Sequence, residues 1–106
     1  MGLFNTLTTE TKCANCQKLS VFELQFKYGE TWQYNYTIGD IITWGKVNVG
    51  LPHCQRVRIE AISNKCPHCL LEGMEYDIIL EDDRLVASFP VGNTRENQSD
   101  EGFTVE

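Results

Sequence analysis

Two pairs of cysteines with the same spacing constrain this chain more than any other feature of its sequence. The pairs are Cys13-Ala14-Asn15-Cys16 and Cys66-Pro67-His68-Cys69. A gap of two residues lets one tight turn present both sulfurs to a single ion. Two such turns brought together supply four thiolates at the corners of a tetrahedron, which suits Zn²⁺. The sequence therefore predicts a metal site formed by Cys13, Cys16, Cys66 and Cys69.

Other uses of these thiols fit the sequence less well. Disulfides are disfavoured because the cysteines number five and the first residues do not read as a secretory leader. A thioredoxin-like redox site needs one CxxC motif in a βαβ setting, and neither pair has that setting. Iron is also held by four thiolates, so the ligand type does not distinguish it from zinc. We expect one structural Zn²⁺, with iron as the alternative.

The residues around the pairs are consistent with a thiolate site. Lys12, Lys18 and Lys65 all lie within two residues of a paired cysteine. Cations there lower the pKa of thiols and offset the charge of −2 that four thiolates and one Zn²⁺ carry. Imidazole and thiolate both bind zinc, so three further residues stay open as replacement ligands: His53, Cys54 and His68.

The two motifs together resemble the zinc-ribbon and rubredoxin-like class, in which two CxxC knuckles at the tips of β-hairpins hold one ion. The resemblance covers residues 12–20 and 62–72 and the strands that follow them. Knuckles of this class usually carry glycine after the second cysteine, where the backbone turns to positive φ. Gln17 and Leu70 occupy those positions here. The 49 residues between Cys16 and Cys66 imply a ribbon with a large insertion.

Alternation of apolar and polar residues predicts a mainly β, antiparallel fold of about six strands. Residues 21–28 place Phe22, Leu24, Phe26 and Tyr28 on one face, and we expect them to pair with an aromatic strand over 31–38. Further strands are predicted at 41–44, 56–61, 74–80 and 85–91, the last two as a hairpin, with a loop over 45–53. No segment has a helical pattern.

Seven of the eleven aromatic residues lie between Phe22 and Trp44. An aromatic sheet face can stack nucleobases, but such faces carry basic residues beside the rings. Residues 21–44 contain one lysine and three acidic residues. We therefore expect these rings to form the hydrophobic core over the metal site.

A length of 106 residues allows one ordinary domain. We expect a single zinc-stabilised β domain over 1–91 and an acidic mobile tail over 92–106, which has one arginine against four acidic residues. No apolar run approaches the roughly 20 residues that span a bilayer. With no secretory leader expected, the prediction is a cytoplasmic protein that does not enter membranes.

No catalytic constellation is evident, and four thiolates leave zinc no open position, so the sequence does not predict an enzyme. The net charge of −6 favours a partner with a basic surface. The leading hypothesis is a protein-interaction module, such as an inhibitor or immunity-type protein that neutralises a basic protein. The candidate partner-binding residues follow the second knuckle: Glu72, Glu75, Asp77, Glu81, Asp82 and Asp83.

Two alternative functions remain from the same motifs. A nucleic-acid-binding zinc ribbon would use Lys12, Lys18, Arg56, Arg58 and Lys65, although the net charge disfavours it. A rubredoxin-like electron carrier would hold iron in place of zinc.

Overall fold

The computed structural model describes residues 4–91 and 103–105, and these residues contain nine β-strands. They are β1 (Asn5–Lys12), β2 (Leu19–Phe26), β3 (Gly29–Glu30), β4 (Asn35–Tyr36), β5 (Asn48–Val49), β6 (Arg56–Ser63), β7 (Glu75–Glu81), β8 (Arg84–Pro90) and β9 (Phe103–Val105). This confirms the predicted mainly β class. None of the described residues form a helix that could cross a membrane.

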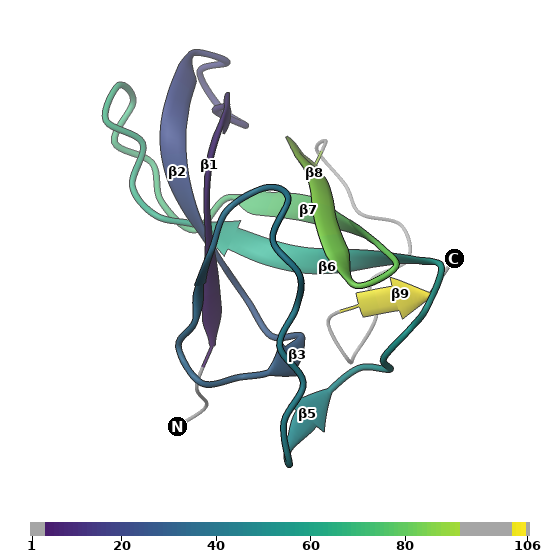
Figure 1. The fold of residues 1–106 in the computed structure, drawn as a ribbon. Helices are drawn as coiled ribbons and strands as arrows, with labels where there is room; N and C mark the ends of the chain where they lie inside the picture. The colour runs from purple at the N-terminus through teal and green to yellow at the C-terminus, as the bar shows by residue number, and fades with distance from the viewer. Residues whose placement is uncertain (1–3, 92–102, 106) are drawn as a thin grey trace.

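One sheet of seven strands dominates the molecule, in the order β4-β1-β2-β6-β7-β8, with β9 also paired to β6. Strands β3 and β5 form a separate small sheet. In Figure 1 the long β1–β2 hairpin crosses β6 and β7 steeply, so the sheet is strongly bent. All pairs are antiparallel except β1 with β4, which are parallel. The sheet is therefore mixed, whereas the sequence led us to expect purely antiparallel pairing.

Strand β1 was not predicted from the sequence. Its residues NTLTTETK contain one large apolar side chain, so the alternation that marks a half-buried strand is weak. It pairs with β2 along its whole length, from Asn5 opposite Phe26 to Lys12 opposite Leu19. Its four threonines have high β-propensity and were the available signal.

The predicted pairing of 21–28 with an aromatic strand over 31–38 is wrong. Strand β2 lies between β1 and β6, and within 31–38 only the two residues of β4 are extended, beside β1. The side chain of Asn5 explains the difference, because its amide donates to the carbonyls of Tyr28 and Glu30 (both 3.1 Å) and its oxygen accepts the N–H of Tyr34 (3.1 Å). These bonds hold the chain in a loop where a hairpin was expected.

The predicted strand over 41–44 is also wrong, because this segment forms a single β-bridge, Ile41 with Arg84. The backbone on either side of Ile41 bonds to β8 and to the turn before it: the Gly39 N–H donates to Leu85 O (2.7 Å) and the Ile42 N–H donates to Asp83 O (2.8 Å). Since β4 lies against β1, the stretch from β4 to Ile42 joins the two edges of the sheet. The sheet thus curls around its own core.

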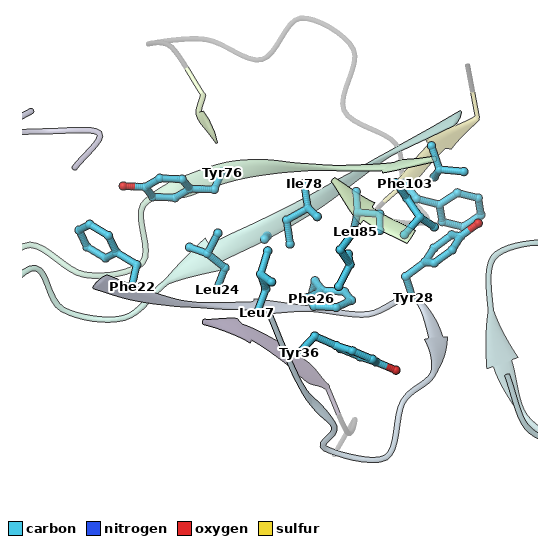
Figure 2. Close-up of a cluster of buried hydrophobic side chains, with 14 of the residues drawn as sticks. Leu7, Phe22, Leu24, Phe26, Tyr28, Tyr36, Tyr76, Ile78, Leu85 and Phe103 are labelled. Atoms are coloured by element: carbon cyan, nitrogen blue, oxygen red, sulfur yellow. The ribbon is translucent and has the colours of Figure 1, made fainter. Parts of the chain in front are cut away.

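The core lies on the concave side of this curled sheet. Phe22, Leu24 and Phe26 point to one side of β2, as the alternation predicted, and Tyr28 follows on the same side just past the end of the strand. All four are buried in the core with side chains from β6 and β7. Figure 2 shows Tyr76 and Ile78 of β7 facing them. Most of the aromatic segment is therefore core, as expected; Trp32 is the exception, because 67% of its surface is exposed.

The C-terminal residues correct the predicted boundary of the mobile tail. Phe103–Val105 form strand β9, which pairs with Val57–Ile59 of β6. Phe103 is only 9% exposed, and burial of this ring is a physical reason for the segment to dock. Residues 92–102 and 106, the rest of the predicted tail, lie outside the described residues. The hairpin over 74–91 agrees with prediction: β7 and β8 are joined by Asp82 and Asp83, both at positive φ.

Candidate metal centre

The four paired cysteines come together at one end of the molecule. Cys13 and Cys16 lie in the turn between β1 and β2, and Cys66 and Cys69 lie in the loop between β6 and β7. Their sulfurs all lie within 4.8 Å of one another, with 3.6 Å between Cys13 and Cys69 and 3.8 Å between Cys16 and Cys66. A tetrahedron with Zn–S bonds of about 2.3 Å has edges of about 3.8 Å, so these spacings fit one zinc ion. None of the four is in a disulfide.

The two turns have nearly the same backbone geometry. The carbonyl of Cys13 accepts the N–H of Gln17 (3.0 Å), and the carbonyl of Cys66 accepts the N–H of Leu70 (2.9 Å). The N–H groups of Cys13 and Cys66 donate to residues 18 and 71, at 3.0 and 2.9 Å. Gln17 and Leu70 have φ of 64° and 67°. Both turns therefore adopt the left-handed conformation expected after the second cysteine of a CxxC knuckle, without a glycine at that position.

Backbone N–H groups point at the first sulfur of each knuckle. The Cys13 sulfur accepts the N–H of Asn15 (3.3 Å) and of Cys16 (3.4 Å), and the Cys66 sulfur accepts the N–H of His68 (3.4 Å). Burial raises the pKa of the Cys13 thiol, but these N–H groups outweigh it and the pKa is lowered. The turns are thus built to hold thiolates.

The pKa values of the Cys69 and Cys16 thiols are shifted in opposite directions. The Asn15 side chain and the Leu71 backbone lower the pKa of Cys69 to about 6. The Lys18 backbone lowers the pKa of Cys16, but burial and the neighbouring thiols outweigh it and raise that pKa to about 11. Four adjacent negative charges repel one another unless a cation lies between them. The donor set therefore fits a divalent, sulfur-preferring cation such as Zn²⁺.

Two residues of the β7 region support the first knuckle, and sequence reasoning missed both. The buried hydroxyl of Tyr76 donates to the carbonyl of Lys12 (2.8 Å) and accepts the N–H of Ala14 (3.1 Å). The sulfur of Met74 lies 3.7 Å from the Cys13 sulfur. Burial raises the pKa of Tyr76 to about 12, so its hydroxyl stays protonated and keeps donating. No motif marks these residues, because their role depends on a contact across more than sixty residues.

The three open ligands do not join the cysteines. Among the described residues, the group whose donor atoms converge contains the four paired cysteines and no histidine. His68 is exposed, and His53 and Cys54 precede β6, whereas the second knuckle follows it. The N–H of His53 donates to both carboxylate oxygens of Asp83 (3.1 and 3.2 Å), and its ring Nδ1 lies 3.4 Å from one of them.

The six candidate partner-binding acids do not form one surface. Asp83 is 5% exposed and its carboxylate accepts the N–H of His53, so it offers little surface to a partner. Glu81 pairs with Arg56 at 2.7 Å, beside the exposed Asp82. Glu75 lies at the other end of β7, about 20 Å away at 3.3 Å per residue. Glu72 is exposed near Glu75, and Asp77 is half-buried. The exposed acids thus fall into two groups, one at each end of β7.

Comparisons of this chain with protein-family models, with curated proteins and with solved structures find no match. The cysteine cluster and the two knuckle turns are compatible with a zinc-ribbon-like class.

Proposed function

We propose that the protein is a small structural-zinc module that serves in protein interaction and has no catalytic role. The observation that carries the metal part is the convergence of four sulfurs at the spacing of a zinc tetrahedron. Four protein ligands fill the coordination shell of zinc, so water and substrates have no open position on the ion. The ion would stabilise the fold and would take no part in a reaction.

The position of the site supports a structural role. Strands β2 and β6 pair only at Leu24 with Ser63 and Gln25 with Ile62. Beyond that point Asn64 bonds Glu23, through its N–H (3.2 Å) and its side-chain oxygen (3.1 Å), and the two strands then separate. The cysteine cluster lies past this separation. A metal there would join the β1–β2 and β6–β7 hairpins where the ladder of hydrogen bonds no longer does.

Elemental analysis of the purified protein tests the metal assignment. We expect one zinc per chain and a colourless solution. A red, iron-loaded protein would instead support the rubredoxin-like electron carrier. Protein that folds without metal and whose four thiols are freely alkylated would overturn the structural-zinc proposal.

The interaction role is supported by the surface beside the second knuckle. Leu70, Leu71 and Glu72 are consecutive exposed residues, and the two leucines are 64% and 46% exposed. Glu75, three residues after Glu72, is also exposed. Exposed apolar side chains next to carboxylates match a partner whose surface is basic and partly apolar. An inhibitor or immunity-type protein that binds a basic protein is a concrete member of this class.

A charge-reversal pair tests this surface. Glu72→Lys with Glu75→Lys should abolish capture of basic partners that the wild-type chain retains at low salt and releases at high salt. The matched control is Asp82→Lys, which changes a carboxylate at the far end of β7. Equal capture by all three proteins would count against a basic partner at this surface.

The nucleic-acid alternative keeps one supporting observation, the exposure of Lys12, Lys18 and Lys65 at the knuckle end. The other two predicted contacts do not join them, because Arg56 is at the far end of β6 in its pair with Glu81 and Arg58 follows it. A gel-shift assay with single- and double-stranded oligonucleotides distinguishes the two candidates. Retardation at micromolar protein would favour the nucleic-acid ribbon.

A further inference from the structure

Strand β9 occupies a site formed by residues far from it in the chain. Its three residues pair antiparallel with β6, with Phe103 opposite Ile59 and Val105 opposite Val57. The ring of Phe103 packs edge-on against the ring of Tyr28, with 5.3 Å between the ring centres. Figure 2 shows these two rings together at the end of the core.

The edge of β6 that β9 covers is divided into two parts. Strand β7 pairs with one edge of β6 along nearly its whole length. The opposite edge pairs with β2 at Ile62 and Ser63, and with β9 over Val57–Ile59 (Figure 1). Without β9, the backbone groups of Val57–Ile59 on that edge would lack a strand partner. An unpaired strand edge is a ready template for an extended peptide.

The chain's own segment fills this site incompletely. Val105 is 47% exposed and Leu51, across from it, is 58% exposed. Between them lies a hollow of about 640 Å³, lined by Asn48–Leu51, Phe103 and Val105. Phe103 is the one largely buried side chain of β9. A short strand with a single buried anchor can be displaced by a peptide that also fills the hollow.

We propose that Val57–Ile59 of β6 form a docking site for an extended segment of a partner protein, in which an aromatic residue is followed two positions later by a large aliphatic residue. The aromatic ring packs on Tyr28 as Phe103 does, and the aliphatic side chain enters the hollow beside Leu51. Residues 103–105 occupy the site in cis and compete with the partner. This rests on the proposed role as an interaction module and gives it a partner chemistry.

A peptide-binding assay on the full chain tests the site. The probe is a fluorescein-labelled hexapeptide, EGFTVE, which copies residues 101–106. A tethered strand competes at an effective concentration in the millimolar range, so Phe103→Ala should bind the probe about tenfold or more tightly than wild type. Phe89→Ala, which removes an exposed ring from β8, is the matched control and should bind like wild type.

Two peptide variants test the proposed specificity. Leucine in place of the valine adds one methylene in the hollow, which should tighten binding about fourfold. Serine in place of the phenylalanine should abolish binding. If folded, metal-loaded Phe103→Ala bound EGFTVE no better than wild type does, the proposal would be overturned.

If Phe103→Ala does not fold, nuclear magnetic resonance of the wild-type protein tests the site. An excess of the leucine peptide should shift the amide resonances of Val57, Arg58 and Ile59, and unchanged resonances would reject the site. A wild-type dimer that dissociates on substitution of Phe103 would assign the site to a second copy and overturn the partner assignment. Zinc content of the same samples tests the metal centre separately, so failure of peptide binding does not count against it.

Discussion

Gln17 and Leu70, the residues after the second cysteine of each knuckle, hold a left-handed backbone conformation with side chains that disfavour it. For residues other than glycine this conformation costs roughly 1–2 kcal/mol. Each N–H nevertheless bonds the carbonyl of the first cysteine in its turn. The knuckle therefore depends on its hydrogen bonds and its ligands to hold a strained residue, which the usual glycine would not require.

Replacing Leu70 by glycine should relieve this strain. We expect Leu70→Gly to raise the free energy of unfolding by about 1 kcal/mol, since glycine adopts positive φ without a Cβ clash. Thermal unfolding of the zinc-loaded protein measures the change. Leu71→Gly is the control, because Leu71 does not have positive φ, and should lower stability. A lower melting temperature for Leu70→Gly would contradict the strain argument.

At the end of the molecule away from the cysteines, Tyr28 makes a pH-dependent contribution to the free energy of unfolding. Burial raises its pKa to about 12, and its hydroxyl donates to the carbonyl of Leu51 (2.8 Å). In the unfolded chain the pKa is about 10. The folded state holds this proton more tightly than the unfolded chain does. The stabilisation of the folded state by Tyr28 is therefore complete below pH 10 and is lost as the pH rises through 12.

Absorbance of tyrosinate, followed together with circular dichroism in an alkaline titration, measures this loss. Wild type should lose stability between pH 10 and 12, and Tyr28→Phe should lose less over that range because it lacks the titrating group. Identical alkaline profiles for the two proteins would contradict the assignment.

At the level of elements, some of the alternating patterns predicted strands that the structure contains, and one predicted a strand that it does not contain. The alternation of β2 and the β7–β8 hairpin are confirmed, because each buries a regular face and the hairpin closes through a local turn. The aromatic alternation of 31–38 was misleading, because the backbone of this segment bonds to Asn5 and Gln33 has a φ of 58°. Alternation shows which side chains favour burial and does not show which strand lies alongside.

Asn5 should therefore be essential to the loop that follows β2. Removing its amide in Asn5→Ala leaves the carbonyls of Tyr28 and Glu30 and the N–H of Tyr34 without this partner. We expect a loss of about 2–3 kcal/mol in the free energy of unfolding, measured with urea. Asn35→Ala, at an exposed position, should change stability by less than about 0.5 kcal/mol. Similar losses in the two variants would argue against the role given to Asn5.

For the whole molecule, the candidate metal centre joins two hairpins whose own pairing is short. Binding of structural zinc contributes about 10–16 kcal/mol in small zinc domains, and much of it becomes folding free energy. A core of this size gives the chain some stability of its own, with buried residues from β2, β6 and β7. Loss of metal should consequently affect the knuckle end first.

Removal of zinc by a chelator should lower the melting temperature and expose the four thiols to alkylation. Acid should do the same, because protons compete with the metal for thiolates and affinity falls as pH falls. Cys66→Ser should bind zinc far more weakly, while Cys54→Ser should behave like wild type, since Cys54 lies outside the cluster. Zinc content, thermal unfolding and thiol titration are the measurements. Unchanged stability after complete removal of zinc would contradict a structural role.

The sequence by itself determined the set of four candidate ligands, the mainly β class and the faces of the regular strands. These follow from spacing and periodicity, which act within a few residues of the chain. Only the tertiary structure decided that β2 pairs with β1, that Asp83 is buried under the His53 loop and that Phe103 packs against Tyr28. Each depends on a contact between residues distant in sequence, and such contacts form only where the folded chain brings complementary groups together.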